Sequence, residues 1–152
     1  MVVENSPSLQ NQNFTIVAWI KLRDGEQLSP NRHDQEVCGY GQNGYLLGIG
    51  GRGEVYLTKT GIDHTTASFR VTDSRFHHLA VTKQGAKVVF YLDGEAHPAP
   101  DYDPGFAFNT YLAVGARGDN FDGTFKGTID ELAVYNRALS AKELKEIVNS
   151  QE

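Results

Sequence analysis

The sequence predicts an all-β fold, a two-sheet antiparallel sandwich, on three observations. Apolar residues alternate with polar ones over many short runs, which is the period of a β-strand. Glycine, which suits tight turns, occurs 16 times and separates these runs, while the 7 Tyr and 8 Phe residues suit pleated surfaces. No strand–helix–strand alternation is visible, which argues against a parallel sheet. A chain of 152 residues fits one domain, residues 1–152.

The first clear strand is expected over residues 14–22. Every second residue from Phe14 to Leu22 is apolar and is expected to face the core, with Trp19 on the opposite face. The polar segment 23–34 is expected to form a loop. Further short strands are expected at 36–40, 45–49, 54–59, 67–71, 76–83, 87–92, 95–98, 111–116 and 125–135.

One short C-terminal helix is expected after the last strand. Ser140 has the character of an N-cap, and Glu143 three residues later completes a capping box. Leu144, Ile147 and Val148 then place an apolar stripe on one side of the helix. This stripe predicts that the helix packs onto the sandwich.

Charge and composition argue against several classes of partner. The formal net charge is −5 and the pI is about 5.5, which disfavours nucleic acid and anionic membrane surfaces. No apolar run approaches the ~20 residues that a membrane span needs, and the first residues do not read as a secretory signal. Cys38 is the only cysteine, so no intrachain disulfide can form, and it is expected to be a small core residue.

Three segments together carry a family resemblance. They are residues 14–21 (FTIVAWIK), residues 76–82 (FHHLAVT) followed by 89–94 (VFYLDG), and residues 127–140 (GTIDELAVYNRALS). In order and spacing they resemble bacterial laminin-G-like domains of the concanavalin A-like lectin/glucanase superfamily. The resemblance covers nearly the whole chain.

The resemblance implies a concanavalin A-like jelly roll of two antiparallel sheets. It also implies a module of a larger secreted or cell-surface bacterial protein that binds a glycan or an extracellular protein, although fold alone does not fix function. Family members usually carry a further strand before residues 3–9. The resemblance therefore implies that this strand, with part of the family's metal site, is lacking here or is supplied from elsewhere.

One cluster of residues suggests a structural calcium site. Asp119, Asn120, Asp122 and Asp130 place oxygen donors on one loop and the strand after it, and calcium prefers six to eight oxygens. The resemblance implies a metal-ligating role for the aspartate at position 130. The alternative interpretation is a solvated acidic loop.

Sugar recognition needs an aromatic face and planar polar groups. The aromatic residues expected outside the core-facing register are Trp19, Tyr40, Tyr45, Tyr102, Phe106 and Phe121. We expect Tyr45, Tyr102 or Phe121 to form a stacking platform at the rim loops, with Asn120 and Arg52 as hydrogen-bonding partners and Asn43 and Asp122 as further candidates. The alternative is that these rings pack under loops or under the helix.

Catalysis is not expected. Glycosidases use a pair of carboxylates that flank the scissile bond, but Asp130 and Glu131 are adjacent on a strand and face opposite ways. His77 and His78 are also adjacent, and they are expected to be structural. The sequence therefore predicts a non-catalytic carbohydrate-binding domain, with a protein-interaction or adhesion domain, or a structural module without a ligand, as the alternatives.

Overall fold

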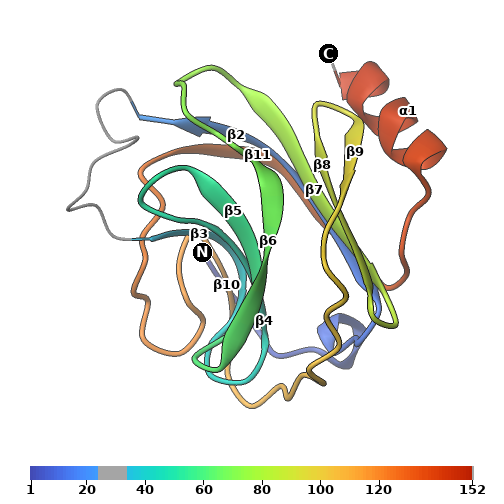
Figure 1. Ribbon diagram of the computed structural model, residues 1–152. Coiled ribbons are helices and arrows are strands. Elements are labelled where there is room, and N and C mark those ends of the chain that lie inside the picture. Colours follow the sequence, from blue (N-terminus) through green and yellow to red (C-terminus); the bar gives the residue numbers. More distant parts are fainter. Residues whose placement is uncertain (24–33, 152) are drawn as a thin grey trace.

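The computed structural model describes residues 1–23 and 34–151, which form two antiparallel sheets packed face to face (Figure 1). The first sheet contains, in spatial order, β1 (Val2–Val3), β10 (Leu112–Val114), β3 (Gln35–Tyr40), β4 (Tyr45–Ile49), β5 (Glu54–Lys59) and β6 (Asp63–Arg70). The second contains β11 (Gly127–Tyr135), β2 (Phe14–Leu22), β7 (His77–Gln84), β8 (Lys87–Leu92) and β9 (Glu95–Pro98). A 3-10 turn, η1 (Pro7–Leu9), and one helix, α1 (Ala141–Gln151), complete the described elements.

These sheets confirm the predicted all-β sandwich. The expected strands at 45–49, 54–59, 87–92 and 95–98 have the predicted bounds, whereas the loop expected at 23–34 lies, apart from its two end residues, outside the described residues. The strand expected at 67–71 begins earlier, at Asp63, because a tight hairpin at Gly61 pairs Lys59 with Asp63. The first residues of β6 are polar, so apolar alternation could not reveal them.

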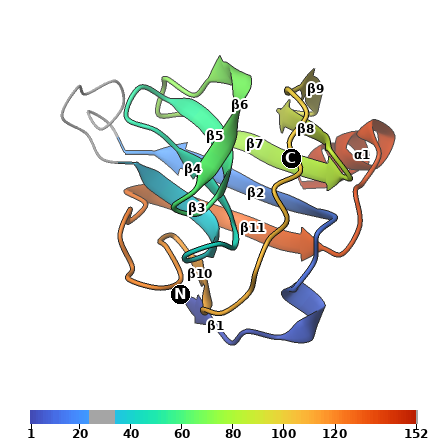
Figure 2. The same cartoon turned by 60° about the horizontal axis from the view of Figure 1, so that its bottom comes forward.

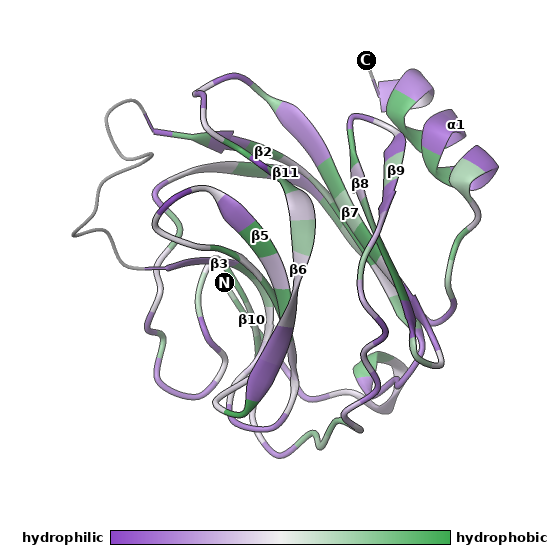
Figure 3. Ribbon diagram, viewed as in Figure 1, coloured by the Kyte–Doolittle hydropathy of each residue, from purple (hydrophilic) through white to green (hydrophobic). Residues whose placement is uncertain are grey.

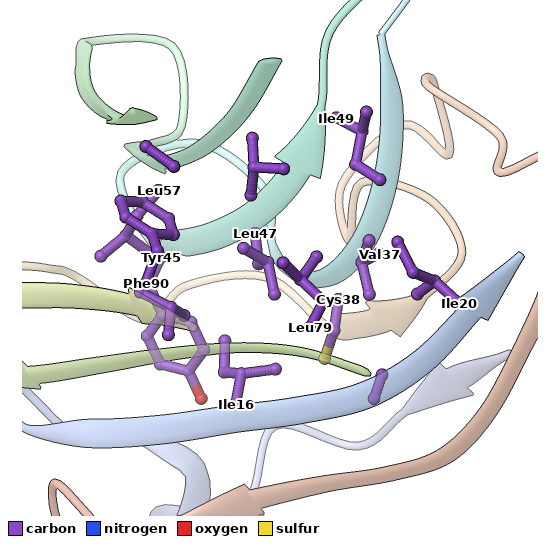
Figure 4. Close-up of a cluster of buried hydrophobic side chains, with 14 of the residues drawn as sticks. Ile16, Ile20, Val37, Cys38, Tyr45, Leu47, Ile49, Leu57, Leu79 and Phe90 are labelled. Atoms are coloured by element: carbon purple, nitrogen blue, oxygen red, sulfur yellow. The ribbon is translucent and has the colours of Figure 1, made fainter. Parts of the chain in front are cut away.

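The core lies between the two sheets. Phe14 and the other alternate residues of β2 through Leu22 are fully buried, which confirms the predicted core face. Figure 4 shows Ile16 of β2 and Leu79 of the same sheet facing side chains of the six-stranded sheet. Cys38 is buried among them as expected, and burial raises the pKa of its thiol to about 12. It is therefore a core residue with an unreactive thiol.

The chain ends lie at different parts of the sandwich. β1 pairs with β10 at one edge of the six-stranded sheet, and Figure 2 shows the N-terminus there. The helix α1 lies beside β8 and β9 of the other sheet (Figure 1). Hydrophobic residues concentrate in the strands and alternate with hydrophilic ones along α1 (Figure 3). Within the described residues, no helix is both long and apolar enough to cross a membrane.

The helix has the predicted start and packing. The backbone N–H of Glu143 donates to Ser140 Oγ at 3.1 Å, and the backbone N–H of Ser140 donates to Glu143 Oε2 at 2.9 Å, which is a complete capping box. Leu144 and Val148 are buried and Ile147 is half-buried in a second apolar cluster on the outer face of the five-stranded sheet. The helix therefore occupies one outer face of the sandwich, and the outer face of the six-stranded sheet is the other.

Candidate functional site

A hollow of about 300 Å³ lies on the outer face of the six-stranded sheet. Side chains alternate along a strand, so the positions between the core residues of β3, β4, β5 and β6 all face this side. They bring Glu36, Leu46, Tyr56 and His64 to one surface. Leu46 forms an apolar part of the lining and is only 1% exposed, and the side chain of Arg117 completes one wall.

The centre of the hollow is a hydrogen-bonded pair on the two strands that flank β4. Glu36 of β3 lies opposite Gly48 of β4, and Gly48 lies opposite Tyr56 of β5. The Tyr56 hydroxyl reaches across Gly48 to both carboxylate oxygens of Glu36, at 3.0 and 2.9 Å. A Cβ atom at position 48 would lie 2.2 Å from Glu36 Oε2 and 2.6 Å from Tyr56 Oη. Glycine is therefore required there for the pair to form.

The carboxyl group of Glu36 has unusual acidity. Burial has the largest influence and, with the nearby charge of Asp34, raises its pKa to about 7, although the hydrogen bond from Tyr56 and the charge of Arg117 act in the opposite direction. Burial and the adjacent Glu36 also raise the pKa of Tyr56, so its hydroxyl keeps its proton. The site thus holds a carboxyl group that changes charge near neutral pH.

The raised pKa predicts a stability cost at this site. Between pH 4.5 and 7 the native Glu36 keeps a proton that the unfolded chain releases, so its contribution to stability falls as the pH rises. We expect Glu36→Gln to be more stable than the wild type by about 3 kcal/mol at pH 8 and by much less at pH 4, because each pKa unit corresponds to about 1.4 kcal/mol.

Urea unfolding of both proteins at pH 4, 6 and 8 measures this difference. Subtracting the two curves cancels the contribution of the histidines and the other carboxylates. Glu95→Gln, at an exposed position of β9, is the matched control and should show no such pH dependence. A stability difference for Glu36→Gln that is constant across these pH values would contradict the assignment.

The loop after β10 forms the wall beside Glu36. The backbone N–H of Glu36 donates to the carbonyl of Gly123 at 2.8 Å, and the N–H of Gly115 donates to the carbonyl of Val37 at 2.9 Å. Within the loop, Arg117 binds Asp119 through two hydrogen bonds of 3.0 and 2.9 Å. These contacts fix the loop against β3, so the wall is part of the folded structure.

The structure contradicts the predicted use of Tyr45 and Tyr102 as stacking platforms. Tyr45 is fully buried, stacks on Phe14 at 4.3 Å, and donates its hydroxyl hydrogen to the carbonyl of Leu9. Tyr102 is 9% exposed, and its hydroxyl accepts from the N–H of Lys59 at 2.7 Å. Neither ring can offer a face to a sugar, because the segments around them fold back onto the core. Two of the other rings considered are also buried, Tyr40 and Phe106.

The remaining predicted ligand-binding residues are exposed but are not brought together around the hollow. Phe121 is 50% exposed in a left-handed backbone conformation, and Asn120 is exposed beside it on the loop after β10. Arg52 is exposed at the turn between β4 and β5. None of the three lines the hollow. Trp19 lies near the end of α1, where its indole N–H donates to Gln151 Oε1 at 3.1 Å.

The carboxylates predicted for calcium are not assembled into one cluster. Asp119 is held by Arg117, while Asp130 accepts a hydrogen bond from the N–H of Glu131 at a bulge of β11. Asp122 is held through its backbone, because its carbonyl accepts from the N–H of Arg117 at 3.0 Å and its own N–H donates to Asn120 Oδ1 at 3.0 Å. Among residues 1–23 and 34–151, no three His, Cys, Asp or Glu side chains gather as metal ligands. Asp119, Asp122 and Asp130 therefore do not fit a calcium site in which all three carboxylates bind one ion.

Calcium binding through one of these aspartates together with backbone carbonyls stays a prediction. An ion that binds the native state alone stabilises it by about 2.7 kcal/mol at a hundredfold excess over its dissociation constant. Melting of a metal-stripped sample with added calcium should then exceed melting with chelator by several degrees. Identical melting curves would remove the hypothesis, and Asp130→Asn would test which carboxylate is used.

The two adjacent histidines face opposite ways, as expected. His77 places its ring nitrogens 2.8 Å from Asp93 Oδ2 and 2.8 Å from Asp73 Oδ1. Burial lowers the pKa of His77, but these two carboxylates outweigh it and raise the pKa overall. His78 is 1% exposed beside Trp19, and burial lowers its pKa. Both belong to the other sheet and not to the hollow.

Sequence reasoning missed the residues that define the hollow. The outward positions of β5 are Glu54, Tyr56 and Thr58, and their alternation with Val55 and Leu57 was a signal that could have found them. The spacing of Asp34 and Glu36, two residues apart on an extended segment, was a second signal. The pairing of Glu36 with Tyr56 carries no sequence signal, because it depends on the register of three strands.

Solved structures with the same fold include three proteins that are connected with carbohydrate. A putative carbohydrate binding protein from Bacteroides ovatus superposes with a TM-score of 0.74 at 20% identity, over 95% of this chain and 43% of that chain. The CBM40 of Ruminococcus gnavus IT-sialidase gives 0.70 at 18% identity, over 93% and 84%. Domain 4 of an extracellular arabinanase from Geobacillus stearothermophilus, solved with arabinotriose, gives 0.68 at 18% identity, over 97% and 75%.

These similarities show a shared fold. The chain spans 43% of the length of the Bacteroides ovatus protein and 39% of a botulinum neurotoxin type G receptor binding domain that it also resembles. A search of curated proteins finds no match. The sequence model of the Laminin_G_3 family, described as the Concanavalin A-like lectin/glucanases superfamily, matches residues 1–145. Because this match covers almost the entire chain, the protein belongs to the Laminin_G_3 family of the concanavalin A-like lectin/glucanases superfamily.

Proposed function

We propose that this domain binds carbohydrate without catalysis, at the hollow on the outer face of the six-stranded sheet. The observation that carries the proposal is the hollow itself, in which a rigid sheet presents hydrogen-bonding side chains and aromatic rings to one concave surface. We also propose that the domain acts as a module of a larger extracellular protein.

The chemistry of the lining suits a sugar. Sugar hydroxyls bond to fixed donors and acceptors, and Asp34, Glu54 and Thr66 supply both kinds along the lining. Glu36 holds the Tyr56 hydroxyl in place among them. The rings of Tyr56 and His64 lie 6.3 Å apart at one side of the hollow and offer apolar edges or faces for a pyranose. A volume of about 300 Å³ lies at the lower end of the range for ligand sites, which fits one or two sugar units.

The related folds support the same class of ligand. Three structural neighbours are a putative carbohydrate binding protein, a CBM40 of a sialidase, and an arabinanase domain solved in complex with arabinotriose. Their identities of 18–20% do not carry over a ligand or its position. They support carbohydrate as the class, while the location in this chain rests on its own hollow.

The burial of Glu36 and its hydrogen bond with Tyr56 favour a binding role over hydrolysis. Its raised pKa resembles that of a general acid, and Asp34 and Glu54 line the same hollow. However, the carboxyl is only 6% exposed, and the Tyr56 hydroxyl occupies both of its oxygens. A general acid must reach the leaving-group oxygen, so this carboxyl is placed to organise the site. Release of reducing ends from any polysaccharide by the pure domain would contradict this proposal.

Tyr56→Ala tests the location of the site. We expect the wild type to bind its glycan with a micromolar to millimolar dissociation constant, or about −8 to −4 kcal/mol. The substitution removes the central ring and the donor to Glu36, so binding on a glycan array should fall below detection. The matched control is Tyr111→Ala, since Tyr111 is 54% exposed beside a different depression near Asn5 and Asp119. Binding that survives Tyr56→Ala and is lost in Tyr111→Ala would move the site to that depression.

A protein partner is the second candidate function. Phe121, 50% exposed on the loop after β10, is the observation that favours it, because exposed aromatic rings are common at protein interfaces. An array on which neither neutral nor charged glycans bind, with and without calcium, would favour this candidate over carbohydrate.

A further inference from the structure

We propose that the hollow selects glycans by charge, accepting uncharged or amine-bearing sugars and rejecting sugars that carry a carboxylate. This inference rests on the proposed function and names the chemical class of its ligand. It follows from where the acidic side chains lie and from what the one nearby guanidinium already binds.

The acidic groups converge at one end of the hollow. Gln35 of β3 lies opposite Ile49 of β4, which lies opposite Val55 of β5, so the starts of β3 and β5 meet at the same end of the sheet. Asp34, Glu36 and Glu54 flank these positions and all line the hollow. The charge of Asp34 is close enough to raise the pKa of the Glu36 carboxyl, so these two groups already repel each other.

The cationic groups of the lining do not offset this charge. The Arg117 guanidinium is already paired along one edge with the Asp119 carboxylate, with Nε 3.0 Å from Oδ1 and Nη2 2.9 Å from Oδ2. The positive charge of Arg117 is therefore balanced by Asp119, and a ligand carboxylate would compete with that partner, which the N–H of Gln42 also holds at 3.0 Å. His64 is exposed on β6, towards the other end of the hollow from the start of β5.

The chemistry of each ligand class then differs at the acidic end. Vicinal hydroxyls of an uncharged sugar donate to carboxylate oxygens, and an ammonium group adds attraction to that donation. A uronate or sialate brings a further negative charge to a hollow that already holds Asp34 and Glu54, and like charges across a binding surface weaken the complex. Salt screens this repulsion, and it does so more strongly where the charged groups are exposed to solvent.

Matched oligosaccharides that share a backbone test the inference at pH 7. The pairs are methyl-esterified with de-esterified oligogalacturonates, lactose with sialyllactose, which extends the same disaccharide by one sialate unit, and N-acetylglucosamine oligomers with glucosamine oligomers. For any backbone that binds, we expect the acidic member to bind at least about tenfold more weakly than the neutral one, and the amine-bearing member to bind at least as tightly. These differences should shrink between 50 and 500 mM salt.

Charge removal tests the residues. The double variant Asp34→Asn, Glu54→Gln should bind the acidic member more tightly than the wild type does, while Glu95→Gln on β9 should leave the ratio unchanged. Neither substitution removes the Glu36–Tyr56 pair, and unfolding curves verify that the variants fold. Binding of an acidic member as tightly as its neutral partner overturns the charge inference and leaves the proposed function standing. If no member of any pair binds, both the proposed function and this inference are overturned.

Discussion

Leu144→Ala is expected to lower the free energy of unfolding by about 2–5 kcal/mol. Leu144 is fully buried where α1 meets the five-stranded sheet, in a cluster with Val17, Ala80 and Tyr91. Truncation removes apolar contacts and leaves a cavity that neighbours on a rigid sheet fill poorly. Since the helix covers the face opposite the hollow, the substitution should not alter the glycan binding that we propose for the hollow.

Chemical denaturation and thermal melting measure this effect, with Lys142→Ala as the matched control on the exposed side of the same helix. In a chain of this size each kcal/mol corresponds to roughly 2–4 °C in melting temperature, so the two variants should differ clearly. A loss below about 0.5 kcal/mol in Leu144→Ala would mean that the helix attaches loosely and that its docking contributes little to the sandwich.

The helix was predictable because its signals are local. Ser140 and Glu143 lie three residues apart, and their reciprocal hydrogen bonds follow from that spacing alone. The strand at Phe14–Leu22 was predictable for the same reason, since its apolar alternation is complete within nine residues. Such features need no knowledge of the rest of the chain.

The candidate site was not predictable in the same way. Tyr45 begins a strand in which Leu46 and Leu47 are both apolar, so alternation could not decide which face the tyrosine joins. Tyr102 lies in an irregular segment, and its burial depends on contacts with Lys59 and Asp63 about 40 residues away. Glycine, proline and aspartate mark a loop, but they do not say whether the loop folds back onto the core.

A buried lysine shows the same limit and also gives the second large expected effect. Along β7 the inward positions are Leu79, Val81 and Lys83, so the strand pattern places a charged residue on the core side. Lys83 is fully buried at the end of the strand. Which group neutralises it could not be read from the sequence, because Asp103 belongs to the segment between β9 and β10 that crosses the end of the sandwich.

The structure satisfies Lys83 through three contacts. Its ammonium lies 2.9 Å from Asp103 Oδ1, donates to the carbonyl of Gln12 at 3.2 Å, and lies 5.6 Å from the centre of the Phe106 ring. A buried ion pair adds little net stability compared with an apolar pair of the same shape, but removal of one partner leaves an uncompensated buried charge. The pair therefore holds the segment around Asp103 against β7.

Asp103→Ala is expected to destabilise the protein by about 1–3 kcal/mol, because the buried Lys83 ammonium loses its counter-charge. The loss is smaller than for a fully buried pair, since the Asp103 side chain is 56% exposed and water screens the interaction. Lys83→Met in the Asp103→Ala background should restore most of this loss, since the double variant buries no unpaired charge. Asp101→Ala, two residues away at an exposed position, is the matched control. Urea unfolding of the four variants, with Lys83→Met alone as the fourth, gives the coupling between the two side chains. If the losses from Asp103→Ala and Lys83→Met simply add in the double variant, the ion pair does not hold this segment. Water, and not Asp103, then solvates the Lys83 ammonium.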